Sequence, residues 1–347
     1  VSGAGAGVSS ELRSANAHSR GCAQTRAIQE ALDTLRGNVK SLVVSGGIPR
    51  ISSKSLTSLK FYREYVAKNQ PVIITGCLNE WPASKLWSMD YLSKILGEEK
   101  VTIDFTPDGR GDSLTPDGKT FVVPATRKVR FRDFAHILRS PKPNRVAYLQ
   151  HQNSNFSKEF KILHSHIKPL RFAEEAFSAP PDAVNIWVGD QRSVSSLHRD
   201  PYENIYCVIR GSKTFTLLPP SDAPYLAEQE FPLAELEMRR HEGGTRDCHW
   251  RINPTGQKVR WIPVDPDFPK RIRADAKCLR NARPDLISPL RCTVDAGEVL
   301  YLPSSWFHQV SQTTLTIAVN FWYDMEFGMR WALLEYLEHS TKIGSAD

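Results

Sequence analysis

The stretch NIYCVIRGSKTFTLLPP, residues 204–220, reads as two consecutive β-strands. Each run is short and rich in β-branched and aromatic side chains; Arg210-Gly211 separates the runs, and a double proline ends the second. Similar runs recur on both sides, most of them divided by Gly or Pro turns: VTIDFTPDG, KTFVVP, RVAYLQHQ, AVNIWVGD, RCTVDAGEVLYLP and LTIAVNFWYD. Such a series predicts a mainly β domain, either a barrel or a double-sheet jelly roll.

Helical patterns flank the strands and divide the chain into three parts. We predict a mobile N-terminal tail with one helix at 1–44, a single domain at 45–325 and a C-terminal helix at 326–347. Within the domain, a charged, proline-containing insert interrupts the strand series at 226–290. Further elements are predicted as helices at 58–69 and 83–96 and a strand at 71–78.

The C-terminal helix carries an apolar stripe of Met329, Leu333, Tyr336 and Leu337. Such a stripe has to be buried, either on the chain's own barrel or against a second copy. We expect a homodimer through this helix.

Composition limits the function classes. No stretch reaches the roughly 18 apolar residues of a membrane span, and the N-terminal residues lack a signal-peptide core. None of the six cysteines form a CxxC pair, which favours reduced thiols in the cytoplasm, and also the nucleus. The net charge of +7 comes from scattered basic residues without a nucleic-acid-binding motif. We therefore expect no membrane association and no stable nucleic-acid complex, but a protein partner.

The main chemical signal is His198-Arg199-Asp200, with His308 lying 108 residues past Asp200. Residues i and i+2 of an extended chain project to the same face, so His198 and Asp200 can bind one metal ion. His308 follows the strand-like run EVLYLP and can supply a third ligand. Two imidazoles and one carboxylate suit non-haem Fe(II), with open positions for a bidentate cosubstrate and O2. Zinc, which also accepts His and Asp, stays open as the alternative.

Three further polar residues fit a cosubstrate site. Lys213 interrupts an otherwise apolar strand, where a buried ammonium requires an anion such as the distal carboxylate of 2-oxoglutarate. A lysine on an edge strand, facing solvent, is the alternative. Asn204 and Asn320 can each hydrogen-bond a carboxylate or orient a metal-bound water, or else satisfy buried backbone groups.

The stretches SLHRDPYENIYCVIRGSKTFTLLPPSD, AGEVLYLPSSWFHQV and IAVNFWYDMEF resemble the Jumonji-C oxygenases. The resemblance runs from about Ile48 to the C-terminal helix and includes FYREYV, TPDG, AYLQHQNSN, PDAVNIWVGD and WIPVDP. Residues 1–44 and much of 226–290 carry little of it.

The resemblance implies a double-stranded β-helix, the cupin-like jelly roll, with iron at its mouth. It assigns iron binding to His198, Asp200 and His308. It assigns the remaining cosubstrate contacts as follows: Tyr148, Ser195 and Lys213 at the distal carboxylate of 2-oxoglutarate, Asn204 and Asn320 near its proximal carboxylate and the metal, and Trp322 in the wall.

The activity implied is that of an Fe(II)- and 2-oxoglutarate-dependent dioxygenase that uses O2 to hydroxylate a protein, in the first place lysyl 3-hydroxylation of a GTP-binding protein. Demethylation of N-methyl-lysine or arginine in histones, processing of histone tails, and a non-catalytic cupin-like binding module are the alternatives. A lysine ammonium requires carboxylates at the rim of the site. Asp108 and Asp112 in TPDGRGD are candidates, although a solvated turn explains them better.

Overall fold

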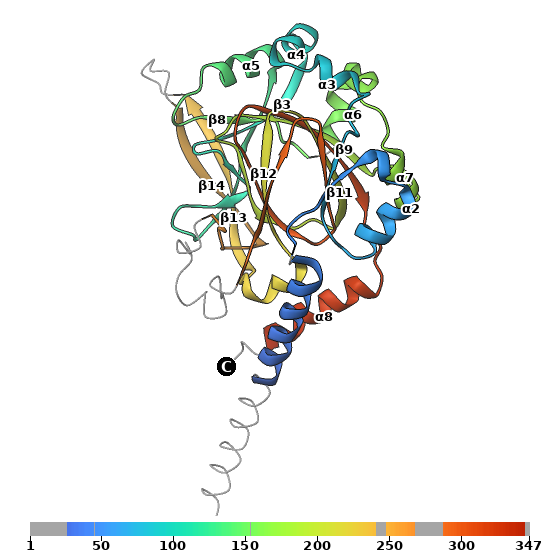
Figure 1. Ribbon diagram of the computed structural model, residues 1–347. Coiled ribbons are helices and arrows are strands. Elements are labelled where there is room, and N and C mark those ends of the chain that lie inside the picture. Colours follow the sequence, from blue (N-terminus) through green and yellow to red (C-terminus); the bar gives the residue numbers. More distant parts are fainter. Residues whose placement is uncertain (1–25, 45, 153, 241–247, 268–286, 344–347) are drawn as a thin grey trace, which may run out of the picture. The chain divides into compact units, whose positions relative to one another are not determined.

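The computed structural model describes residues 26–44, 46–152, 154–240, 248–267 and 287–343 (Figure 1). Two compact units divide the chain: one is Gly46–Glu326, and the other is formed by Val1–Ser45 with Phe327–Asp347. Of the predicted tail, residues 1–25 lie outside the described residues.

The larger unit is built on two facing β-sheets. The six-stranded sheet has the order β1-β2-β16-β11-β18-β9, and the five-stranded sheet has the order β15-β12-β17-β10-β4. The first sheet consists of β1 Arg50–Ser52, β2 Val72–Thr75, β16 Glu298–Leu302, β11 Tyr202–Arg210, β18 Thr316–Asp324 and β9 Ala183–Gly189. The second consists of β15 Leu290–Asp295, β12 Ser212–Leu218, β17 Phe307–Gln312, β10 Val194–His198 and β4 Arg110–Gly111. The expected mainly β, cupin-like jelly roll is confirmed.

Strands β11 and β18 show how the sequence separates core from site. Their alternate residues Ile205, Cys207, Val319 and Phe321 pack in the large hydrophobic core. Because side chains alternate across a strand, the intervening residues, Asn204 among them, project to the opposite face. Both faces of the central strands are therefore buried, one by apolar packing and the other by the inside of the jelly roll.

Two smaller sheets extend the unit. They have the orders β14-β13-β6-β5 and β7-β3-β8. Their strands are β14 Cys248–Trp261, β13 Gln229–Arg240, β6 Phe121–Val123, β5 Ser113–Leu114, β7 Ala125–Arg130, β3 Lys100–Thr106 and β8 Val146–Tyr148.

The insert predicted at 226–290 is not merely an interruption of the strand series. Its described part forms the antiparallel hairpin β13–β14, which joins the sheet through parallel pairing of β13 with β6. In β13 the buried Ala234, Leu236 and Met238 alternate with glutamates, so the period-2 pattern was present but hidden by charge.

In Figure 1 the helices of this unit lie above and to the right of the strands, and the β13–β14 hairpin lies to the left. The helices are α2 Ser58–Phe61, continued by η3 Tyr62–Val66, then α3 Pro82–Leu86, α4 Met89–Leu96, α5 Phe131–Arg139, α6 Asn155–Glu159 and α7 Arg171–Phe177. Short helices occur at η2 Ser53–Ser55, η4 Lys161–His166 and η5 Pro220–Tyr225. The single helix predicted at 83–96 is two helices, since Trp87 is extended and Ser88 caps the second by accepting the Tyr91 amide at 3.1 Å.

In the smaller unit, a helix at 26–39 continues as η1 Lys40–Val44, and the C-terminal helix is α8 Met329–Ile343. None of the helices within the described residues is both long and apolar enough to cross a bilayer.

Candidate functional site

Strands β10 and β17 bring the three predicted metal ligands together. His198 and His308 are direct cross-strand partners in this antiparallel pair, and the register shifts between Ser195 and His198. Asp200 follows two residues after His198. One ligand atom from each of the three side chains lies within 4.8 Å of the others. The Asp200 Oδ2 is 3.8 Å from Nε2 of His198 and 3.6 Å from Nε2 of His308.

Both imidazoles are oriented by the backbone. The Nδ1 atoms of His198 and His308 lie 2.7 Å and 3.0 Å from the carbonyl oxygens of Ser196 and Trp306. With the proton on Nδ1, each ring donates a hydrogen bond to that carbonyl. Each Nε2 then presents a lone pair, as in metal-binding histidines. Burial, and then the neighbouring His198, lower the pKa of His308 to about 4, which keeps it neutral and able to bind metal. Two such imidazoles and one carboxylate on one side of the cavity fit an Fe(II) ion.

The segment that precedes His308 is held by buried polar contacts. The Glu203 carboxylate accepts hydrogen bonds from the Tyr301 hydroxyl at 2.7 Å and the Ser304 hydroxyl at 2.8 Å. The Trp306 indole donates to the Asn69 side chain at 2.7 Å. These contacts fix the path of the chain into β17, and with it the position of His308, the third predicted ligand.

A cavity of about 370 Å³, open to solvent, adjoins the three ligands. Of the residues singled out in the sequence, it is lined by Tyr148, Ser195, His198, Asp200, Asn204, His308 and Trp322. Lys213 and Asn320 lie behind this lining, fully buried.

Lys213 is a buried cation within the jelly roll. Its side chain is 0% exposed, which rules out the solvent-facing alternative. The ammonium donates to the Tyr148 hydroxyl at 2.8 Å, and Tyr148 shares a hydrogen bond with Ser195. Within the described ranges, no carboxylate forms an ion pair with Lys213, and burial lowers its pKa to about 7. An anion entering the cavity would contact Tyr148, which lines the cavity and accepts a hydrogen bond from this ammonium.

The two asparagines form a short chain of hydrogen bonds. The Trp187 indole donates to Asn320 Oδ1 at 2.8 Å, and Asn320 Nδ2 donates to Asn204 Oδ1 at 3.1 Å. Asn320 thus orients Asn204, which reaches the cavity. Trp322 stacks on Tyr202 with ring centroids 5.0 Å apart.

Several lining residues were not anticipated. They are Gln152, Trp187, Tyr206, Phe215 and Val310. The period-2 rule would have found three of them, because Tyr206, Phe215 and Val310 each lie two positions beyond a predicted site residue. Trp261, at the end of the insert hairpin, stacks on the His198 ring at 6.1 Å with an interplanar angle of 9°, and no local sequence signal predicted this contact.

The structure separates the two candidate rim carboxylates. Asp108 is exposed and accepts the Arg110 amide at 3.1 Å, so it stabilises a solvated turn. Asp112 is partly buried beside β10, where Ser196 donates a hydrogen bond to its carbonyl oxygen. Burial, followed by the nearby Asp104, raises the pKa of Asp112 to about 6.

Fold and site together define a jelly-roll protein with a cluster of two histidines and one carboxylate that could hold a metal ion beside its cavity. The model of the cupin-like domain matches residues 58–329. The chain belongs to the cupin-like, JmjC-domain family.

Three relatives show how far the similarity extends. The JmjC domain-containing protein E of Dictyostelium discoideum is 40% identical, over 82% of this chain and 87% of that protein. The human bifunctional peptidase and (3S)-lysyl hydroxylase JMJD7 is 37% identical, over 94% of this chain and 99% of that protein. The lysine-specific demethylase JMJ32 of Arabidopsis thaliana is 37% identical, over 88% of this chain and 90% of that protein.

Proposed function

We propose that this chain is an Fe(II)- and 2-oxoglutarate-dependent lysyl hydroxylase, which introduces a 3-hydroxyl group into a lysine of a GTP-binding protein. The main observation is the fully buried Lys213, whose ammonium donates a hydrogen bond to Tyr148. Tyr148 lines the same cavity as the His-Asp-His cluster. Similarity to a (3S)-lysyl hydroxylase along nearly the whole chain supports the choice of reaction.

The cavity has two ends that match the two ends of a dicarboxylate. At one end, His198, Asp200 and His308 would hold iron and leave positions for a keto acid chelate. At the other end, Lys213, Tyr148 and Ser195 would hold the distal carboxylate through charge-assisted hydrogen bonds. In this arrangement Asn204 and Asn320 would lie near the proximal carboxylate of the cosubstrate, and Trp322 would form part of the cavity wall.

When bound, iron together with 2-oxoglutarate and O2 supplies the oxidising power for C–H hydroxylation, and the cosubstrate leaves as succinate and CO2. The protein's own residues position the reactants. The rings of Trp322 and Trp187 keep the cavity wall apolar, and the backbone carbonyls of Ser196 and Trp306 keep the metal-binding imidazoles in one orientation.

Mass spectrometry tests the proposal. A developmentally regulated GTP-binding protein is incubated with the chain, Fe(II), 2-oxoglutarate and air, beside a reaction with the Asp200→Ala variant. We expect one added oxygen on a lysine and stoichiometric succinate, neither of which forms with the variant. If none of the proteins tested supports 2-oxoglutarate turnover, a non-catalytic binding module would be favoured.

Demethylation is the second candidate, favoured by the equal identity to JMJ32. Methylated histone peptides in the same assay would then lose the mass of a methylene and release formaldehyde. Shortened peptides would instead indicate processing of histone tails. Either result without lysine hydroxylation would replace our assignment.

A further inference from the structure

We infer that the Asp112 carboxylate receives the ammonium of the substrate lysine and thereby selects an unmodified lysine. This inference rests on the lysyl hydroxylation proposed above and names the residue that determines its specificity.

Asp112 lies beside the strand that carries the first metal ligand. It directly follows β4, which pairs in parallel with β10 so that Gly111 lies opposite Ser195. The Ser196 hydroxyl donates to the Asp112 carbonyl, which ties the residue to the backbone two positions before His198. The carboxylate is within electrostatic range of the His198 ring. Asp112 does not itself line the cavity, so a cation bound to it would lie at the rim, on the side where Ser195 and His198 line the cavity.

Within the described residues, the cationic groups near this carboxylate are the His198 and His151 imidazoles, and no lysine or arginine pairs with it. Within the parts of the chain that the structure describes, no hydrogen bond or ion pair reaches its oxygen atoms. Arg110, two residues earlier, is turned to Asp265 at 3.0 Å. The neighbouring Asp104, in contrast, accepts the Thr126 hydroxyl at 2.8 Å. A partly desolvated carboxylate without a partner is unfavourable, so this site is complete only with a cation from outside.

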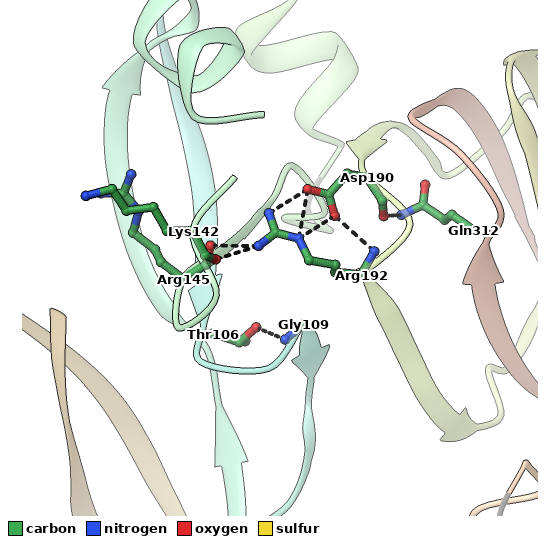
Figure 2. A network of polar contacts seen from close by, with 7 residues as sticks. All are labelled: Thr106, Gly109, Lys142, Arg145, Asp190, Arg192 and Gln312. Atoms are coloured by element: carbon green, nitrogen blue, oxygen red, sulfur yellow. Dashed lines mark hydrogen bonds and ion pairs between the residues drawn. The ribbon is translucent and has the colours of Figure 1, made fainter. Parts of the chain in front are cut away.

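A network of polar contacts, shown in Figure 2, holds the loop that leads to Asp112. The Gly109 amide donates to the Thr106 hydroxyl at 2.9 Å, and the Gly109 carbonyl accepts the Val194 amide at 2.9 Å. Arg192 donates to Asp190 at 2.6 Å and, through Nη1, to the Lys142 carbonyl at 2.6 Å.

This clamp places the carboxylate before any substrate arrives. Gly109 packs so closely on the Arg192 carbonyl that a Cβ would lie 1.9 Å from its oxygen, so only glycine fits at this point of the loop. A preorganised anion loses little conformational entropy on binding, which increases the affinity for a matching cation.

The position also suits the shape of a lysine side chain. The length of the side chain separates its ammonium from its β-carbon, so an ammonium held by Asp112 at the rim leaves the β-carbon free to approach the metal cluster. A primary ammonium can donate hydrogen bonds to the carboxylate, whereas a trimethylated one cannot and is bound preferentially by aromatic rings.

Backbone conformation alone does not explain why this residue is aspartate. Asp112 has a φ of 49°, in the left-handed region that asparagine adopts as readily. Asp112→Asn therefore keeps the turn and the side-chain shape and removes only the charge. Asp108→Asn removes the same charge from the same loop, at an exposed position, and serves as the matched control.

The test compares synthetic peptides of the GTP-binding protein that contain lysine, norleucine or trimethyl-lysine at the target position. Peptide binding is measured by calorimetry without oxygen, and KM by 2-oxoglutarate turnover in air. We expect the wild type to bind the lysine peptide roughly tenfold to a hundredfold more tightly than the norleucine peptide. Asp112→Asn should lose this preference and keep its affinity for 2-oxoglutarate, while Asp108→Asn should behave as the wild type does.

Three results would overturn the inference. Equal binding of lysine and norleucine peptides by the wild type would do so without any variant, even if Asp112→Asn failed to fold. An unchanged preference in Asp112→Asn would place the ammonium elsewhere, and an equal loss for both peptides would make Asp112 a residue that only shapes the loop. If the wild type hydroxylates no lysine peptide, the proposed function itself is wrong.

Discussion

At the scale of single residues, the site contains ionisable groups that require a bound partner: a metal ion for the triad and an anion for Lys213. The triad combines two imidazoles with one carboxylate, and Lys213 is a buried lysine without an anion in the described part of the chain. Each makes a separate prediction.

The triad is expected to be essential for turnover but not for folding. His198→Ala or Asp200→Ala should lower 2-oxoglutarate turnover by more than about a hundredfold and weaken iron binding, because a ligand matters more than its outer partner. Iron analysis and far-UV circular dichroism follow the two effects separately. Full turnover at equal iron occupancy would contradict the assignment of either ligand.

Lys213→Ala should raise the KM for 2-oxoglutarate roughly tenfold to a hundredfold, since one charge-assisted hydrogen bond is lost. Lys213→Arg should also impair binding, because the planar guanidinium does not fit a space shaped for an ammonium. Steady-state kinetics with saturating protein substrate gives both values. An unchanged KM in Lys213→Ala would place the distal carboxylate elsewhere.

The lowered pKa of Lys213 makes cosubstrate binding pH-dependent. In the free protein this lysine is largely neutral above a pH of about 7, and a bound carboxylate should restore its charge. Binding above that pH should therefore take up about one proton, and binding well below it none. Calorimetry of 2-oxoglutarate with Mn(II), in buffers of different ionisation heats, measures the uptake, which Lys213→Arg should abolish.

The lowered pKa of Lys213 also makes the stability of the ligand-free protein depend on pH. Because the folded pKa is below the unfolded value of 10.5, the unfolded chain binds more protons between pH 7 and 10.5, and stability of the ligand-free protein rises with pH there. Below pH 7 Lys213 is charged in the folded protein, and the free-energy cost of burying that charge is fully present. Lys213→Met should therefore stabilise the free protein most at low pH, and a pH-independent difference in unfolding free energy would contradict this.

At the scale of elements, the β11–β12 hairpin is a tight constraint on the sheets that carry the site. Gly211 has a φ of 72°, and a Cβ there would lie 2.4 Å from the Leu315 carbonyl oxygen. Gly211→Ala should destabilise the protein by about 1–3 kcal/mol or more, from backbone strain and steric overlap together.

Gly297→Ala provides the control for this prediction. Its φ of 89° gives comparable backbone strain, but nothing lies within 4 Å of the added Cβ. Urea unfolding of both variants should therefore show the larger loss for Gly211→Ala. Equal losses would mean that the contact with Leu315 can relax without cost.

At the scale of the whole molecule, the homodimer remains a prediction. In the single chain, Met329, Leu333 and Tyr336 of the C-terminal stripe are 76%, 55% and 67% exposed. A two-fold contact between copies would bury this stripe twice. Light scattering should show a dimer at micromolar concentration, and Leu333→Glu should shift it to a folded monomer. A monomeric wild type would refute the idea.

What the sequence determined by itself is local. The β-branched and aromatic runs in residues 204–220 predicted paired strands. The spacing of His198 and Asp200 predicted that both can bind one metal ion, because residues two apart on a strand project to the same face. The fold class followed from many such strands and turns. The alternation within β13 carried the same information, but its glutamates masked it.

Only the tertiary structure decided what lies across from what. Cross-strand pairing brought His308, the predicted third ligand, beside His198, Trp261 reached the His198 ring from the insert, and Asp112 rather than Asp108 came to lie beside β10. Burial likewise showed Lys213 to be an enclosed cation rather than an edge-strand lysine. Register and burial arise from contacts between segments far apart in the chain, and a local pattern of residue types carries no record of them.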